Sequence, residues 1–225
     1  MSKIAVIIYG PPGAGKGTQA NLLTLRKNFI HFDTGKYLEQ LVHDPGLQND
    51  ETIKKERELF DNGILLTPSF VLDVISAKAE KIANADFNLV FSGSPRTLFE
   101  AFGDENHRGL IEILEKHYGK ENIYPILLEI DPEISIQRNK FRWVCSVCST
   151  GGLYGGENKT CFLCGGALRK RTVDNPAVFK TRIEEYRQRT EPILQELEKK
   201  NYTIIKIVAG ALPFQIHEEL LKYLA

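Results

Sequence analysis

The chain has 225 residues and a formal net charge of zero, because 29 lysines and arginines balance 29 aspartates and glutamates. A neutral chain lacks the overall positive field that attracts nucleic acid or anionic membranes, so any charge-based function must be local. Residues 4–9 are too few for a signal-peptide core, and no later apolar run approaches eighteen residues, which predicts a soluble cytoplasmic protein. The length allows one core that carries small inserted lobes.

Residues 4–9 form an apolar, β-branched run that ends at glycine and proline, which predicts a buried strand. The next nine residues, GPPGAGKGT at 10–18, match the phosphate-binding pattern GxxxxGK. Its glycines let backbone N–H groups approach an anion, and the helix expected from residue 19 adds its positive N-terminus. Lys16 would supply a full charge for nucleotide phosphates, so the loop is predicted to bind them.

One departure from the general phosphate-loop pattern identifies a family. Ser or Thr usually follows the lysine to hold Mg²⁺, whereas here Gly17 does and the hydroxyl moves to Thr18. The form GPPGAGKGTQA resembles the nucleoside monophosphate kinases, and the adenylate kinases most closely. That resemblance implies Mg²⁺-dependent transfer of the γ-phosphoryl group of ATP to a nucleoside monophosphate. The implied ATP-binding residues of the loop are Gly13, Ala14, Gly15, Lys16, Gly17 and Thr18.

Strands and helices alternate along the rest of the chain. Further strands are predicted at 89–91, 124–130 and 204–208, and 29–32 is a short apolar segment that precedes a helix capped by Asp33 or Thr34. Helices are predicted at 68–84, around 110–114, after Pro132 through Arg138 and Arg142, at 175–199 and at 213–224. This alternation predicts an α/β fold, a P-loop NTPase-type doubly wound parallel sheet with two small inserted lobes.

The two lobes divide the chain into segments. The core is expected to comprise residues 1–33, 67–142 and 170–225. Residues 34–66, charged and broken at 44–46 and 62–63, resemble the lobe that binds the monophosphate, and residues 143–169 are predicted to form a zinc-binding lid.

All four cysteines lie in two CxxC knuckles, Cys145 with Cys148 and Cys161 with Cys164. Twelve residues between the knuckles give the spacing of a tetrahedral four-thiolate zinc site. Four protein ligands leave no open coordination position, so the zinc would be structural. A pair of structural disulfides is the competing interpretation, which a reducing cytosol disfavours.

Taken alone, the cysteine module could also be a nucleic-acid-binding ribbon. Its flanks argue against this, because Arg138 and Arg142 before it and Arg171 and Arg182 after it resemble the hinge and lid arginines of bacterial adenylate kinases. With these pieces the resemblance spans residues 10–210, and it implies a monomer whose partners are ATP and a nucleoside monophosphate, not nucleic acid or membrane.

Phosphoryl transfer between phosphates needs no general base, because the acceptor oxygen is already anionic. A cluster of cations is therefore expected, and guanidinium groups match phosphate oxygens bidentately. The predicted catalytic residues are Lys16, Arg96, Arg138, Arg142, Arg171 and Arg182. Arg138, Arg142 and Gly210 are further expected on the ATP side, with the backbone of Gly210 beside the donor adenine. Lid and lobe would close over both nucleotides to exclude water.

The resemblance implies a monophosphate site made of Thr34, Gly35, Lys36, Gly93, Arg96, Glu100, Arg171 and Arg182. Two departures fall near it. Ser92 stands where the family has an aspartate that holds Mg²⁺ through water, so the carboxylate charge is missing. Glu39 stands where the family has an arginine to the acceptor phosphate. Like charges about 4 Å apart repel by about 4 kcal/mol at an effective dielectric constant of about 20, so Lys36 is expected to replace the missing cation. Ser92 and Glu39 together suggest a second interpretation, a nucleotide-binding protein of the same fold that has lost turnover.

Glu100 is a third departure, since the family usually has glutamine there. A carboxylate only accepts hydrogen bonds, whereas glutamine can both accept from and donate to adenine. Guanine presents two adjacent donors, so one hypothesis makes GMP the best-matching acceptor. The alternative is that Glu100 is a solvated helix residue in a shifted register.

Overall fold

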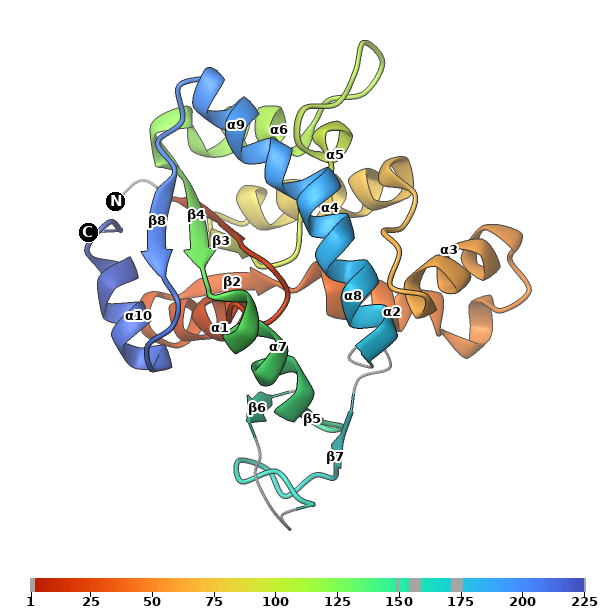
Figure 1. The fold of residues 1–225 in the computed structure, drawn as a ribbon. Coiled ribbons are helices and arrows are strands. Elements are labelled where there is room, and N and C mark those ends of the chain that lie inside the picture. Colours follow the sequence, from red (N-terminus) through yellow and green to blue (C-terminus); the bar gives the residue numbers. More distant parts are fainter. Residues whose placement is uncertain (1–2, 149, 154–158, 171–175, 225) are drawn as a thin grey trace.

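The structure is a computed structural model that describes residues 3–148, 150–153, 159–170 and 176–224 (Figure 1). Its centre is a five-stranded parallel sheet in the order β2-β3-β1-β4-β8. The strands are β1 (Ala5–Tyr9), β2 (Phe29–Phe32), β3 (Asn88–Phe91), β4 (Ile123–Glu129) and β8 (Ile205–Val208). The predicted doubly wound α/β fold is confirmed.

β2 is a strand that the sequence pattern did not identify. It has four residues and lies at the edge of the sheet, paired only with β3. Phe29 and Phe32 are buried, but Ile30 is exposed and His31 is half-buried. The apolar run is therefore too short and too mixed to be recognised as a strand without its partner.

Helices cover both faces of the sheet, as Figure 1 shows. Alternate residues of β1 point to opposite faces: Ala5, Ile7 and Tyr9 join one buried cluster, and Val6 and Ile8 join the other. The first cluster includes residues of α4 (Pro68–Asn84), α5 (Leu98–Phe102), α6 (Leu110–Tyr118) and α9 (Glu191–Lys199), and the second includes residues of α1 (Lys16–Lys27) and α10 (Pro213–Leu221). Burial on both faces explains why the central strands are continuously apolar.

A long helical segment crosses in front of the sheet and leads away from the lid. It consists of α8 (Pro176–Glu185), a π-helical turn at Tyr186–Thr190 and α9. The predicted helix over 175–199 is thus confirmed over its described residues, with a π-helical turn that the periodicity did not reveal. Short 3-10 turns lie at Pro45–Leu47 and Lys120–Asn122.

Two helices, α2 (Thr34–Val42) and α3 (Glu51–Asp61), form the segment predicted to bind the monophosphate. Asp33 is the N-cap of α2, and its Oδ1 accepts a hydrogen bond from the Lys36 N–H. Asp50 caps α3 in the same way, accepting from two backbone N–H groups. Leu38 and Phe60 belong to the first core cluster, so these helices pack against the main body.

Gly63 fixes how this segment meets α8. Its φ is +73°, and a Cβ placed there would lie 2.4 Å from Cγ1 of Val178. We expect Gly63→Ala to lower the free energy of unfolding by about 1–3 kcal/mol, because it combines backbone strain with a steric clash. Gly119→Ala is the matched control, since its φ is also positive but its added Cβ would meet only the side chain of Glu121. Equal losses for both variants, measured by chemical denaturation, would show that the Val178 contact contributes nothing.

The lid carries a three-stranded antiparallel sheet in the order β6-β5-β7, which Figure 1 shows below α7 (Pro132–Phe141). Its strands are β5 (Arg142–Cys145), β6 (Gly151–Leu153) and β7 (Leu168–Arg169). The helix predicted to run through Arg138 and Arg142 ends before Arg142, so that part of the prediction is wrong. Arg142 has an extended backbone and pairs with Leu153, because pairing between β5 and β6 ends the helix at Phe141. Arg138 and Arg142 do not share a helix face.

Among the helices of the described residues, none has the length and apolar character that a membrane crossing needs. The division into core, lobe and lid at the residue numbers given above stays a prediction.

Candidate active site and cysteine cluster

The phosphate-binding loop connects β1 to α1, which begins at Lys16 rather than at residue 19. Gly13 has a φ of +89°, and a Cβ there would lie 2.3 Å from Nδ2 of Asn139 and 2.8 Å from the carbonyl oxygen of Ser135. The Ser135 hydroxyl also donates to the Pro12 carbonyl oxygen at 2.5 Å. The loop therefore packs directly on α7, and only glycine fits at residue 13.

Lys16 lies at the centre of a group of cations. Its Nζ donates to the carbonyl oxygens of Gly10 at 2.6 Å and Pro11 at 2.9 Å. Burial holds the pKa of Lys16 well below its usual range, the charges of Arg96, Arg182 and Arg142 lower it further, and Asp33 opposes them. Three further predicted catalytic residues, Arg96, Arg142 and Arg182, thus lie close enough to Lys16 to repel its charge, and bound phosphates would relieve that repulsion.

Arg96 lies among residues predicted to bind the monophosphate. Its Nε donates to the Gly93 carbonyl oxygen at 2.5 Å, and its Nη2 would lie 3.2 Å from a Cβ at Gly93 and 3.5 Å from one at Gly35. Thr34 is 1% exposed, and its Oγ1 has no hydrogen-bond partner in the described part of the chain. The Thr190 hydroxyl, in the π-helical turn, donates to the Arg96 carbonyl oxygen at 2.9 Å. Thr34, Gly35, Gly93 and Arg96 therefore meet at the carboxyl ends of β2 and β3.

Arg138 lies beside Gly210, and its contacts differ from those of the Lys16 group. Its Nη1 donates to the Ala209 carbonyl oxygen at 2.8 Å and its Nη2 to that of Gly210 at 3.3 Å. Burial lowers the pKa of Arg138. Arg171, predicted as a catalytic residue and for the monophosphate site, lies outside the described residues.

Ser92 belongs to a chain of three polar side chains from three elements. Nε2 of His31, on β2, lies 2.6 Å from Oγ of Ser92, and Nδ1 of His31 lies 2.7 Å from Oδ1 of Asn21 on α1. Burial lowers the pKa of His31. The charge of Asp33 raises that pKa, and the charge of Lys36 lowers it. In the neutral tautomer that donates from Nδ1 to Asn21, Nε2 of His31 accepts the hydroxyl proton of Ser92.

Glu100 is 1% exposed, so the alternative of a solvated helix residue is wrong. Its Oε2 accepts from the Arg96 N–H at 2.8 Å and its Oε1 from the Thr97 hydroxyl at 3.1 Å. Thr97 in turn accepts from the Glu100 N–H at the start of α5, so the two residues form a local cap. Burial raises the pKa of Glu100, and the hydrogen bond from Arg96 opposes the rise. Both carboxylate oxygens are thus engaged by the chain itself.

Glu39 forms an ion pair with Arg169 of the lid, with Nη2 and Oε1 separated by 3.5 Å. Glu39 lies on α2 and Arg169 on β7, so the pair joins the two segments that were predicted to close over the nucleotides. Lys36, the predicted substitute cation, is exposed and its charge acts on His31.

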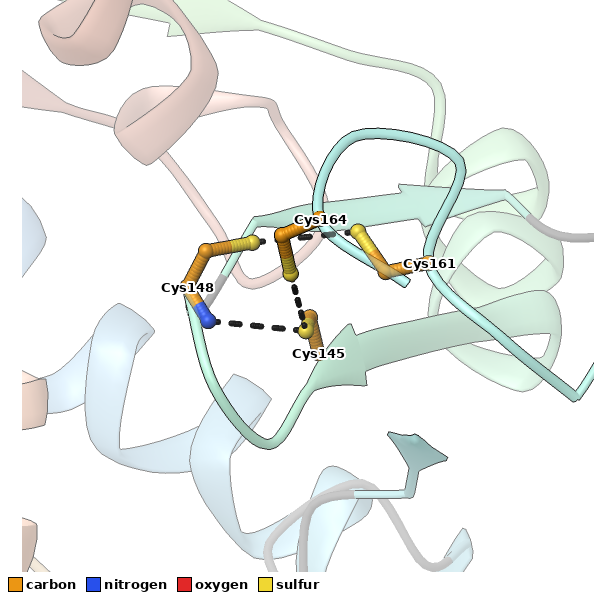
Figure 2. Close-up of side chains that lie close together, drawn as sticks. All are labelled: Cys145, Cys148, Cys161 and Cys164. Atoms are coloured by element: carbon orange, nitrogen blue, oxygen red, sulfur yellow. Dashed lines mark hydrogen bonds between the residues drawn. The ribbon is translucent and has the colours of Figure 1, made fainter. Parts of the chain in front are cut away.

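The four cysteines lie together in the lid, as Figure 2 shows. All four Sγ atoms lie within 4.8 Å of one another; those of Cys145 and Cys164 are 3.4 Å apart, and those of Cys148 and Cys161 are 3.7 Å apart. Sulfur atoms around a tetrahedral zinc lie about 3.8 Å apart, given Zn–S bonds of about 2.3 Å. A disulfide needs about 2.05 Å, so the disulfide interpretation is wrong for this structure. Hydrogen bonding with the side chain and the backbone of Thr150 lowers the pKa of the Cys148 thiol to about 6, which favours the thiolate that binds metal.

The sequence did not point to three residues that the structure places at the site: His31, Asp33 as a charge near Lys16, and Arg169. His31 and Asp33 flank the end of a strand that was not identified, so their neighbours could not be assigned. Arg169 is one of several basic residues after the second CxxC knuckle, and only the strand pairing of β7 with β5 brings it to Glu39.

Comparison with known proteins agrees with this geometry. The family model "Adenylate kinase" matches residues 8–202. Proteins named adenylate kinase from Borrelia turicatae and Rhizorhabdus wittichii are 30% and 31% identical to the chain, and each match covers 87% of both proteins. The adenylate kinase from Kosmotoga olearia is 29% identical over 97% of this chain and 98% of its own length. These matches do not favour the interpretations without turnover or with a nucleic-acid ligand. The chain belongs to the adenylate kinase family, and it is a nucleoside monophosphate kinase, a phosphotransferase.

Proposed function

We propose that the chain transfers the γ-phosphoryl group of Mg·ATP to AMP and so forms two molecules of ADP. The observation that carries this proposal is the group of cations around Lys16, to which Arg96, Arg142 and Arg182 contribute. Three arginines and a lysine gathered in this way fit a site for several phosphate groups at once.

Each cation has a distinct proposed role. Lys16 and the N–H groups of the loop hold the donor phosphates, because the loop leads into the N-terminus of α1. Arg96 binds the acceptor phosphate, since it lies with Thr34 and Gly35 at the ends of β2 and β3. Arg142 and Arg182 neutralise the charge of the phosphoryl group in transfer. Arg138 borders the donor adenine beside Gly210.

Magnesium fits the donor side, where the described residues offer hydroxyl and carboxylate oxygens, the ligands it prefers. These are the Thr18 hydroxyl at the start of α1, the Ser92 hydroxyl and the Asp33 carboxylate. When bound, Mg²⁺ would neutralise charge on the donor phosphates. The chain's part is to place these oxygens and to exclude water.

Zinc fits the cysteine cluster, where it would hold the lid together. The lid residues that the structure describes contribute to neither apolar core cluster, so bound metal would supply the lid's folding energy in place of burial. The ion pair of Glu39 with Arg169 supports closure of lid and lobe toward each other.

The acceptor is taken as AMP from the name of the relatives, and the contacts of Glu100 support it. Releasing the Glu100 carboxylate to read a guanine edge would leave the Arg96 N–H without its partner inside the protein, which is costly. We expect kcat/KM for AMP to exceed that for GMP, CMP and UMP by at least about tenfold. Steady-state assays with each of the four monophosphates and Mg·ATP measure this.

Glu100→Gln separates the two roles considered for this residue. A capping role predicts that the variant keeps the preference for AMP, because the glutamine oxygen can still accept from the Arg96 N–H. If the wild-type protein turned over GMP as well as or better than AMP, and Glu100→Gln restored the preference for AMP, the carboxylate would be shown to read the acceptor base.

A further inference from the structure

Ser92 leaves the donor side without the carboxylate that the family places at this position, and the strand register shows where a replacement lies. β2 and β3 are parallel, and Phe32 pairs with Phe91 as the last pair. The next residues along the two strands are Asp33 and Ser92. They emerge side by side at the carboxyl edge of the sheet, where ligands bind in open α/β folds.

Two observations place Asp33, one relative to Lys16 and one relative to Arg96. Its charge is the one that opposes Arg96, Arg182 and Arg142 in setting the pKa of Lys16, so it lies within electrostatic reach of the donor lysine. Gly35 lies next to both Asp33 and Arg96. A Cβ added at Gly35 would lie 3.6 Å from Oδ1 of Asp33 and 3.5 Å from Nη2 of Arg96. The carboxylate therefore stands between the phosphate-binding loop and the acceptor side.

One oxygen of Asp33 is used and the other is not. Oδ1 accepts from the Lys36 N–H at 3.1 Å as the cap of α2. Oδ2 accepts no hydrogen bond within the described ranges, and Asp33 is half-buried rather than sealed from water. Ser92 is less accessible to a hydrated metal ion, because it is 7% exposed and its Oγ lies 2.6 Å from Nε2 of His31.

We propose that Asp33 supplies the carboxylate for the magnesium that accompanies ATP, so that the charge missing at Ser92 is restored from the neighbouring strand. Asp33 would hold a metal-bound water through Oδ2 while Oδ1 keeps the helix cap. Ser92 adds an uncharged acceptor beside it. The inference rests on the proposed function, since it concerns the metal that this function requires.

The test moves the carboxylate and follows metal binding without turnover. Asp33→Asn removes the charge but keeps the cap, because asparagine is as good an N-cap as aspartate. Asp33→Asn with Ser92→Asp moves the charge to the neighbouring strand. Asp50→Asn is the matched control, since Asp50 caps α3 in the same manner. The measured quantity is the dissociation constant for Mn²⁺, used in place of Mg²⁺, from the protein–ATP complex without acceptor, followed by the electron paramagnetic resonance signal of free Mn²⁺.

We expect Asp33→Asn to weaken Mn²⁺ binding about 10- to 100-fold, the double variant to recover most of that loss, and Asp50→Asn to have no effect. Unchanged Mn²⁺ affinity in Asp33→Asn, or no recovery in the double variant, would overturn the inference. Thermal unfolding of each variant checks that the caps are intact. Binding of ATP by the wild-type protein is measured separately by calorimetry. If ATP binds but the Asp33 variant keeps its Mn²⁺ affinity, only the inference about Asp33 fails. If ATP does not bind at all, the proposed function itself is contradicted.

Discussion

Lys16→Met is expected to lower kcat for phosphoryl transfer by about 10³-fold without lowering the thermal unfolding temperature. The activity falls because the donor phosphates lose the one full charge that the phosphate-binding loop supplies. Stability does not fall, because Lys16 is desolvated and repelled by Arg96, Arg182 and Arg142 in the ligand-free protein. Methionine has a similar length and carries no charge, so it removes that repulsion.

Lys27→Met provides the control, because Lys27 lies exposed at the last residue of the same helix. We expect its kcat to match that of the wild-type protein. Steady-state kinetics and calorimetric unfolding of both variants measure the two effects. A Lys16→Met protein that keeps its rate would contradict the assignment of Lys16 to phosphate binding, and one that unfolds at a lower temperature would contradict the inferred repulsion of Lys16 by the arginines.

Removing the zinc ligands is expected to disable the lid while the rest of the protein stays folded. In the variant Cys161→Ser/Cys164→Ser, bound zinc should fall from about one ion per chain to none, since tight binding needs the thiolates. We expect kcat to fall at least about 10²-fold, because Arg142 begins a strand of the lid sheet and would lose its fixed position. The central sheet should persist, because its two buried clusters contain no described lid residue.

Leu163→Ser is the matched control for this variant. It makes a polar substitution inside the same CxxC knuckle, at a side chain that is 65% exposed and is not a predicted ligand. Zinc content by a colorimetric chelator, circular dichroism and kcat should all match those of the wild-type protein. Cysteine variants that lose zinc but retain full activity would contradict a structural role for the metal in lid closure.

Local signals predicted much of this molecule. The phosphate-binding loop is a contiguous motif whose glycines have one physical purpose, so the sequence alone indicates both its shape and its ligand. The two CxxC knuckles are also local, and the structure brings their four Sγ atoms within 4.8 Å of one another. The helix over 68–84 carries its own apolar stripe and starts at a proline, so it was predicted at its observed bounds.

Features that depend on pairing between distant segments were not predicted. Arg142 was assigned to a helix, because nothing near it in the sequence shows that β5 pairs with β6. The contact of Ser92 with His31 requires the register of β2 against β3, and β2 was not recognised as a strand. The burial of Glu100 and its cap with Thr97 follow from how α5 packs, so the sequence could not exclude that this residue was solvated.

The central claim is that phosphoryl transfer occurs directly between two phosphates within the cation group around Lys16. ³¹P nuclear magnetic resonance of the wild-type protein with ATP, AMP and Mg²⁺ tests it most directly, because it resolves the phosphates of ATP, ADP and AMP and inorganic phosphate in one experiment. We predict loss of the ATP and AMP signals and growth of both ADP signals, with no inorganic phosphate formed. Release of inorganic phosphate without consumption of AMP, or no change in any signal, would contradict the claim.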